Sequence, residues 1–257
     1  MKRIALLVAS MALTLLFASG LAFALNTIHC SAGTCNGTAR SDRLIGTEYG
    51  DSIYGRLGGD MLQGKNGVDN LYGNRGDDVL HGGFAADRLC GGPGDDTLDG
   101  GANLSHESGG DRYYFNGGWG EDTITDTDYA EYVSFSGCRR DAVPITGVVK
   151  TDLTIKLAPV RGPQVTDGTN TIEWGRLPIA WLKGGLGDDR ITGDGRGNNL
   201  DGGLGQDIIG SGAGPDRIDA GHDRKQPDFV NCGDGNDAVI IDESVDTVSA
   251  NCEHVYP

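Results

Sequence analysis

The chain has 257 residues, 44 of which are glycine, and its formal net charge is −16. Glycine normally contributes about 7% of residues, and aromatic residues make up only 7% of this chain, so a conventional globular core would be difficult to build. The acidic balance argues against nucleic acid as a partner, because binding phosphates requires clustered Lys and Arg.

The first 24 residues have the composition of a secretory signal peptide. A basic start at Lys2 and Arg3 precedes a long apolar run, which ends at the small-residue pattern Ala22-Phe23-Ala24. These features are typical of a cleaved signal, so we expect cleavage after Ala24 and a secreted, extracellular product. A transmembrane segment is the alternative, but no basic stop-transfer segment follows. We therefore predict no membrane anchor.

A nine-residue repeat begins after residues 25–41, which are expected to form an N-terminal cap. In each unit an aspartate is followed two positions later by an aliphatic residue and two positions after that by a glycine. The aspartates are Asp42, Asp51, Asp60, Asp69, Asp78, Asp87 and Asp96. The aliphatic residues are Leu44, Ile53, Leu62, Leu71, Leu80, Leu89 and Leu98.

The clearest copy, GGPGDDTLD at residues 91–99, resembles the RTX, or haemolysin-type, calcium-binding nonapeptide repeat. The resemblance implies an all-β fold: a right-handed parallel β-roll, or β-solenoid, of GGxGxDxUx repeats with stacked calcium-binding turns. Glycine allows the turn because it reaches positive φ, and the aliphatic residue points inward from a short strand. Two units make one turn of eighteen residues, so alternate aspartates should line two opposite edges.

Stacked carboxylates require a compensating cation. Two unit charges about 5 Å apart repel by about 3 kcal/mol at an effective dielectric near 20. Calcium binds six to eight oxygen ligands from carboxylates and main-chain carbonyls, and glycine leaves those carbonyls accessible. A flexible Gly/Asp-rich linker is the alternative reading of this composition, but the strict register argues against it.

The first block, residues 42–125, should therefore hold several Ca²⁺ ions. Its expected ligands are Asp51, Gly55, Asp60, Gly64, Asp69, Gly73, Asp78, Asp87, Gly91, Asp96, Gly117 and Asp122. The loops before Asp60, Asp78 and Asp96 keep the fourth-position glycine, whereas those before Asp51 and Asp87 lose it. We therefore expect the edge through Asp51, Asp69 and Asp87 to bind calcium more weakly.

Residues 126–181 lack the repeat but keep the alternation of strands, as in Leu153-Thr154-Ile155-Lys156-Leu157. We expect the same solenoid to continue there with longer, metal-free turns; a separate small β-domain is the alternative. Trp174 and Trp181 are the largest apolar side chains of this interlude, and core packing is their expected role.

The second block, residues 182–257, restores the spacing and ends in a C-terminal cap. Its expected ligands are Gly184, Asp189, Asn198, Gly202, Asp207, Asp216 and Asp237. Asn198 is neutral, so its edge should bind calcium less tightly, and Asp189 with Asp207 should form the best site of this block.

Six cysteines follow the signal peptide, and six allow fifteen disulfide connectivities. Cys232 and Cys252 lie in repeats that should stack one turn apart, which predicts a bond between them. Cys30 and Cys35 can close a small N-terminal loop, which leaves Cys90 with Cys138. A metal-binding cysteine cluster is not indicated, because no CxxC pair exists.

No catalytic motif is found. The chain contains neither HExxH nor GxSxG, and its five histidines are scattered, so we predict that it is not an enzyme. The resemblance implies a secreted calcium-binding protein whose folding calcium drives, acting as an extracellular structural or scaffold module. The alternatives are an adhesin-like binder of surface polysaccharide or a partner protein, and a polysaccharide-acting enzyme using residues 126–181. Tyr54 and Tyr72 should stack in one outward column, either as a ligand platform or, as we favour, as a stabilising cross-strand pair.

Overall fold

The computed structural model describes residues 25–103, 110–115, 120–125, 131–135, 137–138, 154–156, 164–166, 171–174, 179–221 and 226–257. The predicted signal peptide and the predicted ligand Gly117 lie outside these ranges. Every regular element within them is a β-strand, and they contain no helix long and apolar enough to cross a membrane.

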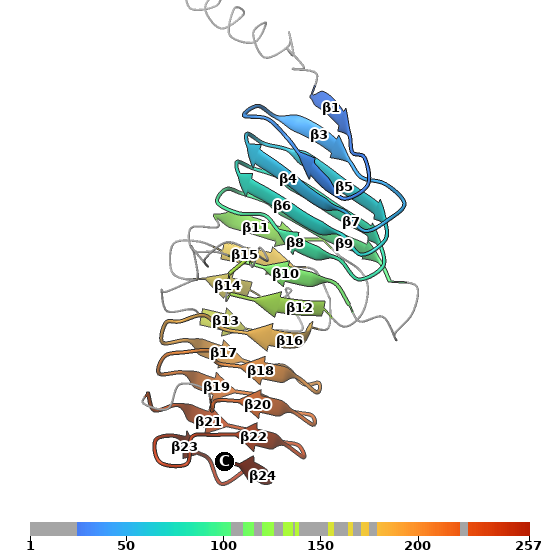
Figure 1. The fold of residues 1–257 in the computed structure, drawn as a ribbon. Helices are drawn as coiled ribbons and strands as arrows, with labels where there is room; N and C mark the ends of the chain where they lie inside the picture. The colour runs from blue at the N-terminus through green and yellow to red at the C-terminus, as the bar shows by residue number, and fades with distance from the viewer. Residues whose placement is uncertain are drawn as a thin grey trace, which may run out of the picture.

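The strands form two long sheets, here called sheet A and sheet B, which run side by side along the molecule (Figure 1). Sheet A contains β1 (Asn26–His29), β3 (Asp42–Ile45), β5 (Met61–Asn66), β7 (Val79–Phe84), β9 (Thr97–Ala102), β11 (Glu121–Ile124), β15 (Thr171–Trp174), β14 (Gln164–Thr166), β13 (Thr154–Lys156), β17 (Arg190–Thr192), β19 (Ile208–Gly210), β21 (Phe229–Asn231) and β23 (Thr247–Val248). Sheet B contains β2 (Thr34–Asn36), β4 (Ser52–Leu57), β6 (Asn70–Arg75), β8 (Arg88–Cys90), β10 (Arg112–Tyr114), β12 (Glu131–Ser134), β16 (Ile179–Lys183), β18 (Asn199–Asp201), β20 (Arg217–Asp219), β22 (Ala238–Ile240) and β24 (His254–Tyr256).

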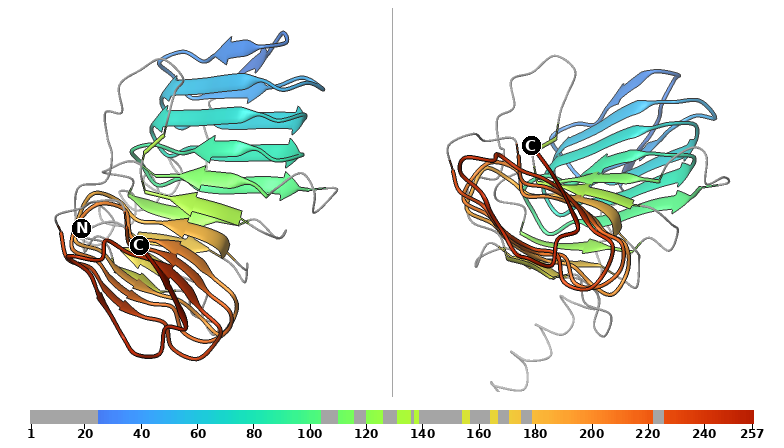
Figure 2. Two further views of the ribbon diagram at one scale, coloured as in Figure 1. Left: turned by 60° about the horizontal axis from the view of Figure 1, so that its bottom comes forward. Right: turned by 90° about the horizontal axis from the view of Figure 1, so that it is seen from below.

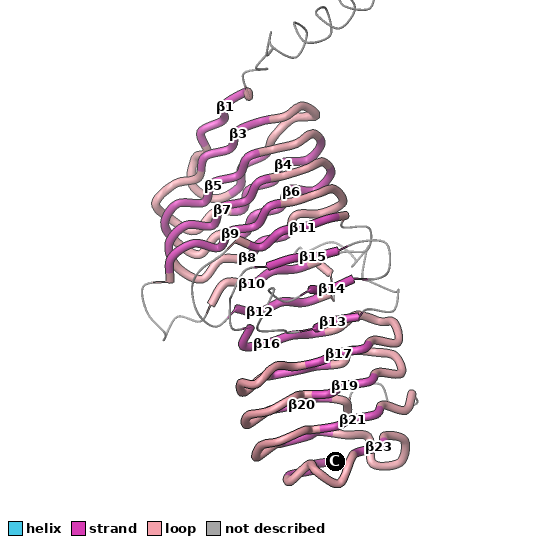
Figure 3. The backbone as a smooth tube through the Cα atoms, turned by 180° about the vertical axis from the view of Figure 1, so that it is seen from behind, coloured by secondary structure: helices cyan, strands magenta, loops and turns pink. Residues whose placement is uncertain are grey.

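The nine-residue repeat sets the register of both sheets. In sheet A Leu44 pairs with Leu62, and Leu62 with Leu80; in sheet B Ile53 pairs with Leu71. All these pairs are parallel and eighteen residues apart, so the chain alternates between the sheets and two repeats complete one turn (Figure 3). The predicted all-β parallel solenoid is confirmed.

The core is a narrow column of the repeat's inward residues. The aliphatic side chains of all seven first-block repeats are fully buried. In the middle of the molecule larger side chains join them: Tyr113 takes the aliphatic position and is fully buried, and Phe115 stacks on Phe135 with ring centroids 5.4 Å apart. The Tyr113 hydroxyl accepts a hydrogen bond from the Gly100 N–H at 2.9 Å, which satisfies the polar end of that ring. Burying these rings extends the apolar column between the two blocks.

The two sheets continue through the interlude by different routes. In sheet B, β12 pairs directly and in parallel with β16. In sheet A, β15 pairs in parallel with β11, and β14 lies antiparallel between β15 and β13. β13 then pairs in parallel with β17 of the second block. The described strands of the interlude thus belong to the solenoid's own sheets, and the antiparallel insertion is a feature that the sequence pattern did not indicate.

One expectation about the interlude is wrong. Trp181 is 46% exposed and lies on the outer face of sheet B, where its ring is 6.5 Å from that of Tyr132. The Trp181 side chain points outward because successive side chains of a strand alternate between its two faces, and the neighbouring Leu182 occupies the inward position of β16 and is fully buried. The side chain of Trp174 lies outside the described part of the structure.

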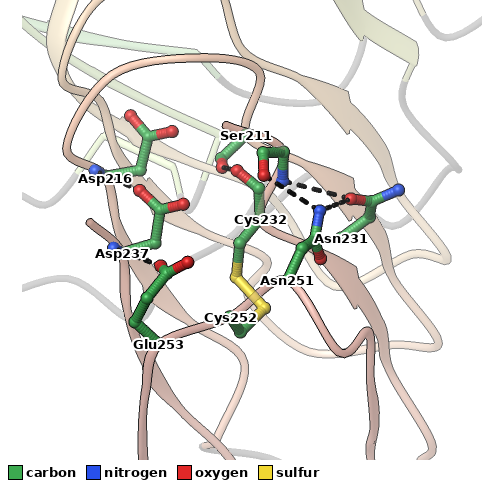
Figure 4. Close-up of a disulfide and its surroundings, with 9 residues drawn as sticks. Ser211, Asp216, Asn231, Cys232, Asp237, Asn251, Cys252 and Glu253 are labelled. Carbon is green, nitrogen blue, oxygen red and sulfur yellow. Dashed lines mark hydrogen bonds between the residues drawn. A yellow bond between two sulfur atoms is a disulfide. The ribbon is translucent and has the colours of Figure 1, made fainter. Parts of the chain in front are cut away.

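The three predicted disulfides are confirmed. Cys30–Cys35, Cys90–Cys138 and Cys232–Cys252 have Cα–Cα distances of 5.4, 6.0 and 5.2 Å. Figure 4 shows the last of these below Ser211, whose hydroxyl donates to the Cys232 carbonyl at 2.6 Å. The bonds tie down the first strands, the junction with the interlude and the last turn.

Four turn residues that are not glycine adopt positive φ. Arg56, Lys65 and Asn74 have φ between 77° and 91°, and Ala85 has a φ of 87°. An L-residue in this region is disfavoured by about 1–2 kcal/mol. Ala85 replaces the fourth-position glycine, which has positive φ at Gly58, Gly67, Gly76 and Gly94 in the other first-block turns.

We expect Ala85→Gly to raise the free energy of unfolding by about 1 kcal/mol, because glycine relieves this strain. Chemical denaturation in saturating calcium measures the change. Ala86→Gly is the control: Ala86 is not at positive φ, so it should gain nothing. Equal stabilisation by both substitutions would contradict the prediction.

Candidate metal centre

The repeat aspartates form a hydrogen-bonded ladder along each edge of the solenoid. From Asp60 and Asp69 onward, the Oδ1 atom accepts a hydrogen bond from the main-chain N–H of the residue at the same place one turn earlier. On the sheet A edge, Asp78 Oδ1 lies 2.6 Å from Asp60 N and Asp96 Oδ1 lies 2.8 Å from Asp78 N. On the sheet B edge, Asp69 Oδ1 lies 2.7 Å from Asp51 N. All these side chains are buried, so the aspartate first of all joins adjacent turns.

The second carboxylate oxygen has no such partner in most repeats. Among the described residues, buried Oδ2 atoms that accept no hydrogen bond include those of Asp60, Asp69, Asp78, Asp87, Asp96, Asp122, Asp216 and Asp237. A buried charged group is costly unless it is paired or coordinates a metal. The same oxygen atom lacks a hydrogen bond at equivalent positions of the repeat, which indicates that a cation binds to it.

The glycine after each aliphatic residue provides the space beside this oxygen. A Cβ built on Gly73 would contact Asp78 Oδ2 and lie 2.6 Å from the carbonyl oxygen of Gly91, one turn later. Gly55, Gly64 and Gly82 have the same surroundings, each facing the Oδ2 of the next aspartate and a glycine carbonyl oxygen of the next turn. Carboxylate and main-chain oxygens therefore converge where any other side chain would intrude.

The electrostatics of these carboxylates confirm that they lack compensation. Burial, together with repulsion from neighbouring aspartates, raises the pKa of Asp60 to about 6, of Asp69 and Asp78 to about 7, and of Asp87 and Asp96 to about 8. For Asp122 burial and the Asp96 charge raise the pKa to about 9. The pKa values rise toward the middle of the molecule because burial deepens there. Without a bound cation the charged form is therefore disfavoured at neutral pH for the carboxylates nearest the middle of the molecule, Asp87, Asp96 and Asp122.

The donor set fits calcium. It consists of carboxylate and carbonyl oxygens, which are hard ligands suited to Ca²⁺. Zinc would instead favour nitrogen or sulfur. No group of three His, Cys, Asp or Glu side chains gathers within the described ranges, so an ion here must take further ligands from main-chain carbonyls and water. Gly55, Gly64, Gly73, Gly91, Gly184 and Gly202 are the glycines expected to take part.

Comparison with known proteins agrees with this geometry. A family model described as the RTX calcium-binding nonapeptide repeat, in four copies, matches residues 36–71, 63–98 and 181–223. The chain carries RTX calcium-binding repeats. The matched segments contain the ladder aspartates from Asp42 to Asp96 and from Asp189 to Asp216, and repeats of this family bind calcium.

The comparisons with curated proteins and with solved structures give less information about this chain. No curated protein matches the chain. Among solved structures it is similar to the AlgE6R3 subunit from the Azotobacter vinelandii mannuronan C5-epimerase. The identity is 21%, the match covers 58% of this chain and 75% of that one, and the TM-score is 0.18. The fold assignment accordingly rests on the strand register of this chain.

The first two RTX turns are built differently from the turns of Asp60 to Asp96 that follow them. Asp51 Oδ2 accepts hydrogen bonds from the N–H and the hydroxyl of Thr47, at 2.7 and 2.9 Å. Asp42 Oδ2 is held in the same way by Thr38, at 2.6 and 2.7 Å. Although burial alone would raise the pKa of Asp42, these bonds, another from Asn26 and the charge of Arg40 together lower it below its ordinary value. A threonine thus supplies what the later turns lack.

Asp69 and Asp87, on the edge expected to be weaker, have the same unpartnered Oδ2 as Asp60, Asp78 and Asp96 on the other edge. Within the first block, the geometry therefore separates the threonine-capped turns from the others, and does not separate one edge from the other.

The second block also contains two kinds of turn, which differ in the hydrogen bonding of the repeat's aspartate or asparagine. Asp216 and Asp237 have an unpartnered Oδ2, and burial raises the pKa of Asp216. Asp189 Oδ2 instead accepts a hydrogen bond from the Gly185 N–H at 2.8 Å, and Asn198 Oδ1 accepts one from the Asp194 N–H at 3.1 Å. Asp207 continues the ladder of Asp189. The turns of Asp216 and Asp237 therefore join the predicted pair Asp189 and Asp207 as candidate cation sites.

Several ladder residues were not among the predicted ligands. They are Asp111, Asp228, Asp246 and Glu253, whose carboxylates accept from the N–H groups of Asp87, Asp207, Asp228 and Asp237. Figure 4 shows Glu253 below Asp237 and Asp216, in the place of a final aspartate. Each is followed two positions later by an apolar residue, a signal that would have found them without the spacing.

We expect Asp78→Ala and Asp51→Ala to differ in their dependence on calcium. Loss of the unpartnered Asp78 Oδ2 should raise the calcium concentration at the folding midpoint by about tenfold or more, because a charged ligand is removed. Asp51→Ala should lower stability by a similar amount with and without calcium, since Thr47 already satisfies its oxygen. Calcium titrations followed by circular dichroism provide the comparison. An equal shift of the midpoint in both variants would contradict it.

Proposed function

We propose that this chain is a secreted structural module whose folding is completed by calcium outside the cell. The observation that carries the proposal is the recurrence, turn after turn, of a buried aspartate Oδ2 atom without a hydrogen bond. At Asp60, Asp69, Asp78 and Asp87 this atom lies near a glycine carbonyl oxygen of the next turn, so one ion can join two successive turns. Binding only to the folded state stabilises that state by mass action.

Different residues of the repeat have different roles in this module. The Oδ1 ladder aligns successive turns, the glycines leave room beside Oδ2, and the leucine column supplies the apolar core. Calcium, when bound, supplies the positive charge that offsets the repulsion between stacked carboxylates. The three disulfides support an oxidising compartment, and extracellular calcium-binding modules typically have dissociation constants of about 10⁻⁴ to 10⁻³ M.

We also propose that the chain is not itself an enzyme. The ladder assigns the paired carboxylates, such as Asp77 with Asp78, a structural position: Asp78 bonds the Asp60 N–H and Asp77 bonds the Asp95 N–H. A hydrolase or lyase activity of residues 126–181 remains the alternative, and it would be detected by assaying the folded protein on polysaccharides.

Circular dichroism of residues 25–257 at pH 8 tests the proposal. We expect little β-structure in a calcium chelator, a cooperative gain of β signal on adding millimolar calcium, and no equivalent gain with magnesium. Disulfides must be intact in both samples, which free-thiol titration verifies. A full β spectrum in chelator at pH 8 would overturn the proposal.

A further inference from the structure

The outer face of sheet B carries a row of aromatic side chains around the junction of the first block and the interlude. Tyr54 and Tyr72 stack with ring centroids 4.8 Å apart and planes within 5°. Beyond β8, Tyr114 lies 5.9 Å from Tyr132, which lies 6.5 Å from Trp181. Figure 1 shows the strands that carry them, β4, β6, β10, β12 and β16, along one side of the molecule. The rings are partly or largely exposed, although apolar burial would favour the interior.

The row is interrupted by a hollow between Tyr72 and Tyr114. At β8 the place of a ring is taken by the disulfide Cys90–Cys138. The hollow has a volume of about 160 Å³, and its lining includes Tyr72, Tyr114, the disulfide, Asn70 and Arg88. A cavity of about 150 Å³ holds one benzene-sized ring. The space thus suits a single ring held between flat side chains, with polar groups at its rim.

Two arginines stand side by side on the same face without carboxylate partners. Arg88 and Arg112 are directly paired in register on β8 and β10, and both are exposed. Neither forms an ion pair with a described residue; Arg88 only reaches Asn70 Oδ1 at 3.4 Å. Like charges directly opposite each other in a sheet are destabilising. By contrast, Lys183 on the same face is paired with Asp201.

The unpaired arginines are notable because the chain as a whole has a net charge of −16. Carboxylates are abundant, yet none among the described residues neutralises this pair. A guanidinium recognises a carboxylate through two parallel hydrogen bonds. The face therefore combines a site for carboxylates with flat rings that can stack on a second flat surface.

We propose that this face binds an acidic polysaccharide, with one pyranose ring in the hollow, neighbouring sugars on the tyrosines and Trp181, and carboxylates on Arg88 and Arg112. Single-stranded nucleic acid also stacks on aromatic rings, but it needs a positively charged groove that follows a phosphate at every nucleotide. Two arginines on a strongly acidic chain do not form such a groove. The inference concerns a face distinct from the calcium turns and goes beyond calcium-driven folding.

Calorimetric titration of the calcium-saturated protein with oligogalacturonate, a short carboxylated oligosaccharide, tests the proposal. We expect saturable binding, with no binding of a neutral malto-oligosaccharide of equal length. Arg88→Ala and Tyr72→Ala should each weaken binding by about tenfold, whereas Tyr72→Phe, which keeps the ring, should retain it. Arg217→Ala is the matched control: Arg217 is exposed and occupies the equivalent outward position on β20, and its loss should leave affinity unchanged.

The outcomes separate this proposal from calcium-driven folding. Circular dichroism in calcium establishes that each variant is folded, and Arg88→Gln provides a second variant at an exposed position. Absence of oligogalacturonate binding by the folded wild-type protein would overturn the proposal while leaving the calcium proposal intact. It would also be overturned if single-stranded DNA bound more tightly than oligogalacturonate, or if Arg217→Ala weakened binding as much as Arg88→Ala.

Discussion

Gly73→Ala is expected to lower the free energy of unfolding in calcium by about 3 kcal/mol and to raise the calcium midpoint. The new Cβ would contact Asp78 Oδ2 and lie 2.6 Å from the Gly91 carbonyl oxygen. Neither atom can move freely, because Asp78 Oδ1 bonds the Asp60 N–H and Gly91 O accepts from the Asn74 N–H at 2.8 Å. Inserting a methyl group into a closely packed site typically lowers stability by about 1–3 kcal/mol. Here the methyl group would also displace two oxygen atoms that we propose as calcium ligands.

Gly210→Ala is the matched control for this substitution. Gly210 also lies in a strand, but a Cβ there would meet no atom within 4 Å. It should change stability by less than about 0.5 kcal/mol. Urea unfolding and calcium titration of both variants measure the difference. If Gly73→Ala unfolded at the same urea concentration as Gly210→Ala, the assignment of Gly73 to the metal turn would fail.

Acid is expected to substitute in part for calcium. In the folded chain without metal, burial raises the pKa values of the ladder carboxylates, from about 6 at Asp60 to about 8 at Asp96 and about 9 at Asp122. Their value in the unfolded chain is near 3.9. Between these limits the folded state binds more protons, so its stability falls as pH rises and increases as pH falls. The gain should end near pH 4, where the unfolded chain is protonated too.

The measurement is circular dichroism of calcium-free protein between pH 8 and pH 5. We expect β signal to increase as the pH is lowered, and urea resistance to increase with it. The calcium-loaded protein should show the opposite trend, because protons compete with the ion for the same oxygens. Asp78→Asn with Asp96→Asn removes two titrating groups while keeping an oxygen at each place, and should flatten the acid response. A calcium-free chain equally unfolded at both pH values would contradict the prediction.

The threonine-capped turns would give the proposed calcium-driven folding a direction. The turns of Asp42 and Asp51 satisfy their carboxylates with Thr38 and Thr47, and Cys30–Cys35 closes the adjacent loop. This end needs no ion to satisfy those oxygens. It can therefore serve as a preformed first turn on which the calcium-dependent turns assemble.

The sequence by itself determined the fold and the ladder of the regular blocks. A nine-residue period with an inward aliphatic residue has one consistent solution, because eighteen residues bring Leu44 over Leu62 and Asp60 over Asp78. The disulfide Cys232–Cys252 followed from the same register. Where an insertion breaks the period, as before Asp111, the ladder continues, but the strict nine-residue spacing does not predict it.

Only the tertiary structure decided which carboxylates need a cation. Asp51 and Asp69 occupy the same place in the repeat, yet Thr47 caps the first and nothing caps the second, a difference that depends on the path of one turn. The antiparallel insertion of β14 and the outward position of Trp181 were likewise decided by pairing between distant segments. Local pattern specifies which side chains face inward, whereas the neighbours across the sheet specify which polar atoms remain without a partner.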